Sequence, residues 1–208
     1  NAIRAGFAFI IVGLGLKLAL LPLHLWLPNA YAFAPNVITV FLAGTATKVA
    51  LYVMLRFIYT IFGGDYSFGA VPLASLMMVL AVAGMVVGSW VAMFEPNLKR
   101  MMAYSSVAQV GYLVLGVALV SMIGLTATFV HLFNHALMKA GLFMALGTVM
   151  YRTGSARIEA FCGIGRQMPW TMSAFALLGL SLIGVPATAG FVSKWYLIWG
   201  ALDAGLVW

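Results

Sequence analysis

The sequence predicts an all-α protein, a polytopic bundle of about six transmembrane helices. Of its 208 residues, 64% are apolar or aromatic and only 7% are charged, against roughly 25% charged residues in an ordinary soluble domain. The apolar residues gather in long uncharged runs, and about 20 such residues suffice to cross a bilayer. We therefore expect residues 1–208 to form one transmembrane domain.

Three spans are expected in the first half of the chain, over residues 5–27, 37–62 and 71–94. Pro35 can open the second span, because the first position of a helix loses nothing when its N–H is missing. The third span is free of charged residues and histidine. Its small residues Gly84 and Gly88 allow another helix to approach closely.

Three further spans are expected over residues 101–120, 125–151 and 170–206. The uncharged run 101–130 is too long for one span, and residues 121–124 are the predicted hairpin within it. Residues 152–168 form the only long polar stretch, which should lie outside the bilayer or on its surface. The last span is too long to be straight and is interrupted at Gly184, Pro186 and Gly190.

Two spans contain a proline break. Pro22 cannot donate to the carbonyl of Leu18, and Pro186 cannot donate to that of Leu182, so each break frees a backbone oxygen at membrane depth. Interrupted helices in the two halves of a transporter are a good pointer to its ion site.

Basic residues predict the orientation in the membrane. Those in the loops after the third and fifth spans are Lys99, Arg100, Arg152, Arg157 and Arg166, against Arg4 and Arg56 on the other side. Because cytoplasmic loops carry an excess of Lys and Arg, loops 95–100 and 152–168 are expected in the cytoplasm. The basic residues form no cluster, which argues against nucleic-acid binding.

Four lysines lie where a charge is costly. Lys17, Lys48 and Lys139 fall near the middle of their spans, and Lys194 follows the second break. A lysine at mid-bilayer costs at least about 2.5–3.5 kcal/mol, so such residues are expected to be functional. Snorkelling toward the surface is the alternative, but Lys17 is about 20 Å along a helix from Arg4.

His131, His135 and Lys139 are spaced i, i+4 and i+8, so they share one stripe of a helix. Imidazole and a buried amine can both exchange protons near neutral pH, and we interpret the stripe as a proton relay. A packed helix contact is the alternative. The two histidines have no third ligand nearby, so no metal site is predicted. The single cysteine cannot hold an iron–sulfur cluster, and no cofactor is expected.

A second polar stripe consists of Ser105, Gln109 and Tyr112, at i, i+4 and i+7. It could hold water between helices or make interhelical hydrogen bonds. The four acidic residues all fall in loops or at the ends of segments: Asp65, Glu95, Glu159 and Asp203. The buried lysines are therefore either neutral during part of a cycle or paired with residues outside this sequence.

Several ordered motifs resemble the antiporter-like membrane subunits of Mrp-type cation/proton antiporters, respiratory complex I and membrane-bound hydrogenases. They are Lys17 with LPLHLWLP (21–28, including His24), Ala34-Pro35, Thr47-Lys48 with Tyr52 and Arg56, Leu98-Lys99-Arg100 with Ala103 to Ser106, Gln109 with Gly111-Tyr112, the His131 to Lys139 stripe, and Gly184 to Pro186 with Gly190 to Lys194. Residues 47–52 are most similar to the D-type branch of the Mrp antiporters. Asn97 departs from the family, which often has Asp there.

The resemblance implies an inverted-repeat transporter fold of about fourteen helices, of which this chain would be an internal piece. Lys17 would pair with a glutamate upstream of Asn1. Lys48, His131, His135, Lys139 and Lys194 would match the central proton-conducting axis, with His24, Ser105, Gln109 and Tyr112 as supporting polar residues. The expected location is a bacterial inner membrane.

The function expected from the resemblance is a proton-translocating subunit of a monovalent cation/proton antiporter. The alternative is a proton-pumping subunit of a respiratory NADH-quinone oxidoreductase or a membrane-bound hydrogenase, driven by electron transfer in partner subunits. A third reading is a scaffold without conduction. Expected partners are the lipid bilayer and other membrane subunits, with protons and either Na⁺ or K⁺ as candidate ions.

Overall fold

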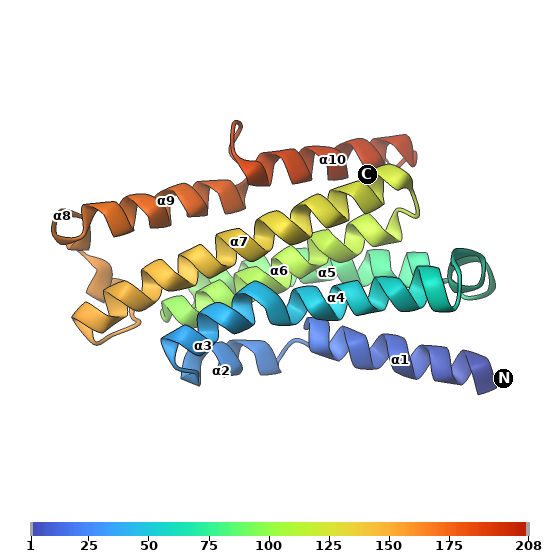
Figure 1. Ribbon diagram of the computed structural model, residues 1–208, viewed down its shortest axis with the longest axis horizontal. Coiled ribbons are helices and arrows are strands. Elements are labelled where there is room, and N and C mark those ends of the chain that lie inside the picture. The colour runs from blue at the N-terminus through green and yellow to red at the C-terminus, as the bar shows by residue number, and fades with distance from the viewer. Residues whose placement is uncertain (1, 207–208) are drawn as a thin grey trace.

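The computed structural model describes residues 2–206, which form an elongated bundle whose helices run roughly along its long axis (Figure 1). Four helical segments are long and apolar enough to cross a membrane: Asn36–Ile61, Leu73–Phe94, Leu98–Ala118 and Met122–Thr153. The predicted all-α membrane bundle with two broken helices is confirmed.

The first apolar run is divided into two helices, α1 (Ala2–Leu18) and α2 (Trp26–Phe33). α1 ends just before a turn region that contains Pro22, and Ala19 in that region adopts a positive φ of 61°. The indole N–H of Trp26 donates to the Leu16 carbonyl at 2.8 Å. The first break is thus closed by a hydrogen bond from α2 to the end of α1.

The second span is one continuous rod with two local changes of winding. α3 (Asn36–Phe41) passes into a π-helical segment, η1 (Leu42–Ala46), then α4 (Thr47–Leu55) and a second π-segment, η2 (Arg56–Ile61). A third π-turn, η3 (Asp65–Ala70), leads to the next helix. The sequence analysis did not predict these π-segments, which commonly occur at functional sites.

α5 (Leu73–Phe94) and α6 (Leu98–Ala118) pack with their backbones in close approach. A Cβ atom at Gly88 would lie 2.9 Å from the Ala108 nitrogen, and one at Gly111 would lie 2.6 Å from the Ala81 carbonyl oxygen. Glycine is therefore required at both positions. The close approach predicted from the small residues of this span is confirmed at Gly88.

Two helices begin earlier than predicted because side chains cap them. α6 begins at Leu98 rather than 101, since Asn97 Oδ1 accepts hydrogen bonds from the backbone N–H groups of Lys99 and Arg100. α7 (Met122–Thr153) begins inside the predicted hairpin 121–124, since Ser121 Oγ accepts from Gly124 N at 3.0 Å. The turn between these helices is shorter than predicted.

The last apolar stretch forms α9 (Pro169–Ile183) and α10 (Ala189–Asp203), while η4 (Ile158–Phe161) and α8 (Ile164–Gln167) lie in the polar stretch. Gly184 ends α9 with a φ of 91°, and Pro186 lies in the break. Gly190 was predicted as part of this interruption but lies inside α10. There it lets α10 pass the carbonyl of Ser181, with which any Cβ atom would collide.

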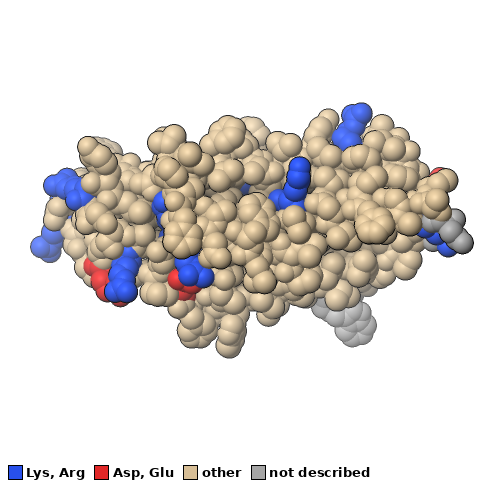
Figure 2. All heavy atoms as spheres, turned by 90° about the horizontal axis from the view of Figure 1, so that it is seen from below, with Lys and Arg blue, Asp and Glu red and all other residues tan. Residues whose placement is uncertain are grey.

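The loops after α5 and α7 meet at the same end of the bundle, as alternation of the spans requires. Leu98 N donates to the Ala156 carbonyl at 2.9 Å, and Ile158 N donates to the Pro96 carbonyl at 3.2 Å. Figure 2 shows charged side chains gathered toward this end, while the sides of the bundle carry few of them.

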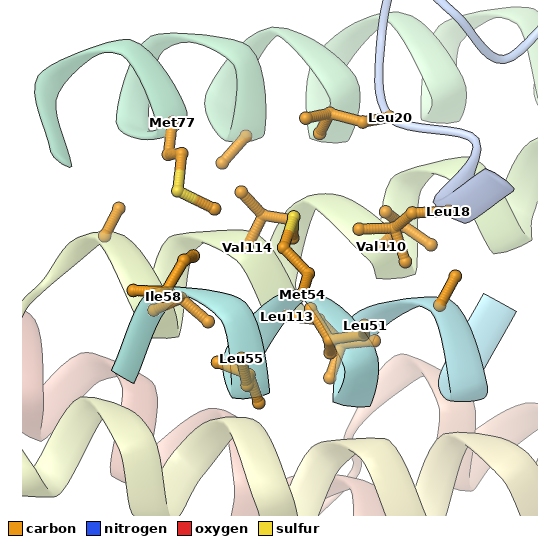
Figure 3. Packing of buried hydrophobic residues seen from close by; sticks show 14 of the residues in the cluster. Leu18, Leu20, Leu51, Met54, Leu55, Ile58, Met77, Val110, Leu113 and Val114 are labelled. Carbon is orange, nitrogen blue, oxygen red and sulfur yellow. The ribbon is translucent and has the colours of Figure 1, made fainter. Parts of the chain in front are cut away.

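Two clusters of buried apolar residues hold the bundle together, and α6 contributes to both. In the first, Figure 3 shows Leu51, Met54 and Ile58 of α4 and η2 facing Val110 and Val114 of α6. The second joins α2, α6 and α7, where Tyr31 meets Phe143 edge to face at 5.3 Å. α6 is therefore the central helix against which the polar residues are placed.

Candidate proton-conducting site

α7 brings His131, His135 and Lys139 together on a face that is completely buried. The two imidazole rings stack almost in parallel, with centroids 5.8 Å apart and an angle of 8° between their planes. The stripe predicted from the spacing is therefore a continuous buried row, because α7 is unbroken over this region.

His131 contacts α10 through Ser193. The Nδ1 atom of His131 lies 2.8 Å from Ser193 Oγ, which also donates to the Gly190 carbonyl. Within residues 2–206, His131 Nε2 and both ring nitrogens of His135 have no hydrogen-bond partner. These nitrogens are thus available to accept or donate a proton.

Lys139 is held by the backbone of α6. Its Nζ donates to the Met102 carbonyl at 2.8 Å, and the same oxygen accepts from Ser106 Oγ at 3.0 Å. Among the described residues, the one ion pair is that between Arg100 and Glu95 at the end of the bundle. Lys139 therefore has carbonyl dipoles and no carboxylate around it in this part of the chain.

Lys48 is buried where the rod of α3 and α4 crosses α7. Its Nζ donates to the carbonyl of Ala43, which lies in the π-segment η1 of the same rod. Next to Ala43, a Cβ atom at Gly44 would lie 3.5 Å from the Cβ atom of Ala140 on α7. Lys48 is therefore anchored to the π-segment that packs against α7.

Lys194 sits at the second helix break and is half-buried. Its Nζ donates to the carbonyls of Leu182 and Ile183 at 3.2 and 2.7 Å, at the end of α9. A cation is favoured there, because the C-terminal end of a helix carries partial negative charge.

Tyr112 of α6 connects Lys194 with the row. The Lys194 Nζ lies 4.8 Å from the centre of the Tyr112 ring, and that ring is 6.0 Å from the ring of His131. Among the described residues, neither Ser105 nor Gln109 forms a side-chain hydrogen bond with the row. Ser105 is half-buried, and Gln109 is buried with an unpartnered Oε1.

Lys17 lies apart from the row and is exposed on the surface of the described bundle. It lines a largely apolar groove of about 850 Å³ with Leu14, Leu16, Trp26, Phe41, Thr45, Ala46, Val49, Ala50 and Val53. The sequence predicted a deeply placed lysine beside the first break; the position in the last turn of α1 agrees, but no described residue covers this face. His24, in the break itself, is buried and packs edge to face on Tyr104 at 6.3 Å.

Sequence reasoning missed two residues of the site region. Ser193 was noted only as part of the Gly190 to Lys194 motif, although a hydroxyl one residue before Lys194 was a signal for a polar contact with the α7 row. Lys99 was counted as a loop cation, but only 4% of its surface is exposed and its Nζ donates to the Ala34 carbonyl at 2.8 Å. The apolar residues that flank it in Leu98-Lys99-Arg100-Met101 were the available signal.

Comparison with known proteins identifies the family of this chain. The family described as "NADH:quinone oxidoreductase/Mrp antiporter, TM" matches residues 1–208. The chain belongs to this family. The family assignment expected from the motifs is confirmed, and with it the assignment of the chain as an integral membrane protein.

Individual members of the NADH:quinone oxidoreductase/Mrp antiporter family are similar over nearly the whole chain. NADH-quinone oxidoreductase subunit N of Desulforudis audaxviator is 46% identical over 200 residues, which cover 95% of this chain and 39% of that protein. A chain of the Mrp complex from Dietzia is 35% identical with a TM-score of 0.92, covering 99% of this chain and 38% of that one.

A chain of an archaeal membrane-bound sulfane sulfur reductase, a respiratory membrane complex, is 37% identical with a TM-score of 0.90. That alignment covers 98% of this chain and 41% of the other. The chain thus spans about two fifths of the length of these relatives, each of which is part of a larger assembly or carries a subunit name.

Proposed function

We propose that this chain is the conducting part of an antiporter-like subunit that moves protons across a membrane. The observation that carries the proposal is a set of four buried titratable side chains on α4 and α7 and one half-buried lysine on α10, with no carboxylate among them. Its members are Lys48, Lys139, His135, His131 and Lys194.

Electrostatic repulsion supplies the mechanism. Like charges repel strongly where the effective dielectric is low, so a proton on His131 disfavours a second one on His135, whose ring centroid lies 5.8 Å away. Each lysine is held by backbone carbonyls, which can accept from either a charged or a neutral amine. A proton that arrives at one member of the row can therefore drive another onward.

The 46% identity with a subunit N supports an NADH-quinone oxidoreductase as the assembly. The test uses membrane vesicles from cells with and without the gene for the full-length protein, supplied with NADH and a quinone. Proton uptake per NADH oxidised should fall when the subunit is absent and return when it is restored. An unchanged ratio would contradict the proposal.

Cation/proton antiport is the second candidate, because the likeness to the Mrp chain has a TM-score of 0.92. In the same vesicles without NADH, an imposed Na⁺ or K⁺ gradient would then drive proton movement that depends on the gene. Gradient-driven exchange together with an unchanged NADH-linked ratio would favour this candidate over the first.

We further propose a bacterial inner membrane, with residues 152–168 on the cytoplasmic side. Cys162 lies in this stretch and is exposed, so it serves as a native reporter. An impermeant thiol reagent should fail to label it in intact cells and should label it in inverted vesicles, with Cys162→Ser as the control for other cysteines. Ready labelling in intact cells would reverse the orientation.

A further inference from the structure

Lys99 is a buried lysine that is not part of the proposed proton path. Its Nζ donates to the carbonyl of Ala34, the residue that follows α2. The same oxygen accepts from the hydroxyl of Thr39 on α3 at 3.3 Å. Since the C-terminal end of α2 carries partial negative charge, the ammonium is well placed there. Lys99 therefore ties α6 to the corner between α2 and α3.

The next turn of α6 contains Met102, which binds Lys139 of α7 through its backbone carbonyl. Met102 follows Lys99 by three residues, so the two lie on the same side of the helix. The Met102 carbonyl accepts the hydrogen bond from Lys139 Nζ. One rigid stretch of α6 is thus bonded to the α2–α3 corner through one residue and to the α7 row through another.

The α2–α3 corner is also the start of the rod that carries Lys48. Asn36–Ile61 is a continuous helical segment, so displacement of its first turn displaces Lys48 as well. Lys99 itself is firmly placed, because its backbone N–H bonds to the Asn97 side chain and the preceding Leu98 N bonds to the Ala156 carbonyl.

We propose that Lys99 is a positioning residue, whose bond to the Ala34 carbonyl sets the position of Lys48 relative to Lys139. The inference deepens the proposed function and rests on it, since proton passage between α4 and α7 depends on that spacing. Lys99 acts through its hydrogen bond to the Ala34 carbonyl, and does not itself have to release a proton.

The test compares Lys99→Met and Lys99→Arg in the full-length protein within its assembled complex. Lys99→Met should lower the proton-transport rate per assembled complex by about tenfold or more, because small misplacements of reacting groups have effects of that size. Lys99→Arg retains a cationic donor and should restore most of the rate. Arg100→Gln removes a neighbouring, more exposed cation and should leave the rate unchanged.

Three results would overturn the inference. Wild-type rates in Lys99→Met would mean that the bond does not set the spacing. A loss of assembled complex with an unchanged rate per complex would mean that Lys99 only stabilises the fold. Failure of Lys99→Arg would mean that a releasable proton is needed. Failure of the proposed function itself is distinct, because wild-type vesicles with intact complex would then transport no protons.

Discussion

Replacement of Lys139 by alanine is expected to abolish proton transport, with a loss on the order of 100-fold or more, the range of effects seen when a proton-transferring group is removed. The Lys139 side chain is fully buried at the end of the α7 row that meets the α6 backbone at Met102. Without the Lys139 amine, His135 has no titratable group one turn further along the same face of α7 to which it could pass a proton. The measurement is proton uptake by vesicles that contain equal amounts of each variant.

The Lys139→Ala variant should still enter the membrane and assemble. A neutral helix inserts more readily than a charged one, and the Met102 carbonyl keeps its hydrogen bond from Ser106 Oγ. Thr148→Ala, an exposed position further along α7, is the matched control and should transport normally. Wild-type rates in Lys139→Ala would remove the lysine from the proton path.

Replacement of Lys17 by arginine is expected to stop transport as completely as replacement by alanine. A guanidinium keeps the positive charge but does not release its proton. Lys17 faces an apolar groove beside the first helix break, and we expect a carboxylate from outside residues 1–208 to meet it there. Approach of that carboxylate would hold the proton on Lys17, and its withdrawal would release the proton toward Lys48.

Rates of proton transport in vesicles at equal expression test the role of Lys17. The control variant is Arg4→Lys, which replaces the other basic residue of α1 by the reverse substitution, arginine to lysine. It should leave the rate of proton transport unchanged. Wild-type rates in Lys17→Arg would show that only a fixed positive charge is required, and the proton-release role of Lys17 would have to be abandoned.

The buried row of His131, His135 and Lys139 could be predicted from the sequence because it lies on one helix. The spacing of His131, His135 and Lys139 places them on one face of any regular α-helix, and α7 is regular there. The two broken helices were predictable for a similar reason, since the effect of proline on its own helix is local.

Orientation and long-range contacts could not be predicted. Apolar residues are spread around every side of α1, so their pattern does not say which face meets other helices. The structure places Lys17 on an exposed face. The bond from Lys99 to the Ala34 carbonyl joins residues 65 positions apart. Such a contact depends on how α2 packs against α6. The spacing of residues within one segment cannot predict the packing of two segments against each other.

The π-segment Leu42–Ala46 lies just before α4. The number of residues in this segment therefore determines the direction in which the Lys48 side chain points. A π-turn can be regarded as an α-helical turn with one residue inserted, and each residue turns an α-helix by about 100°. Deletion of one residue in this segment would thus rotate Lys48 by about a quarter of a turn, away from α7. The direction of the Lys48 side chain thus depends on the extra residue of the π-turn, and not only on the presence of a lysine at position 48.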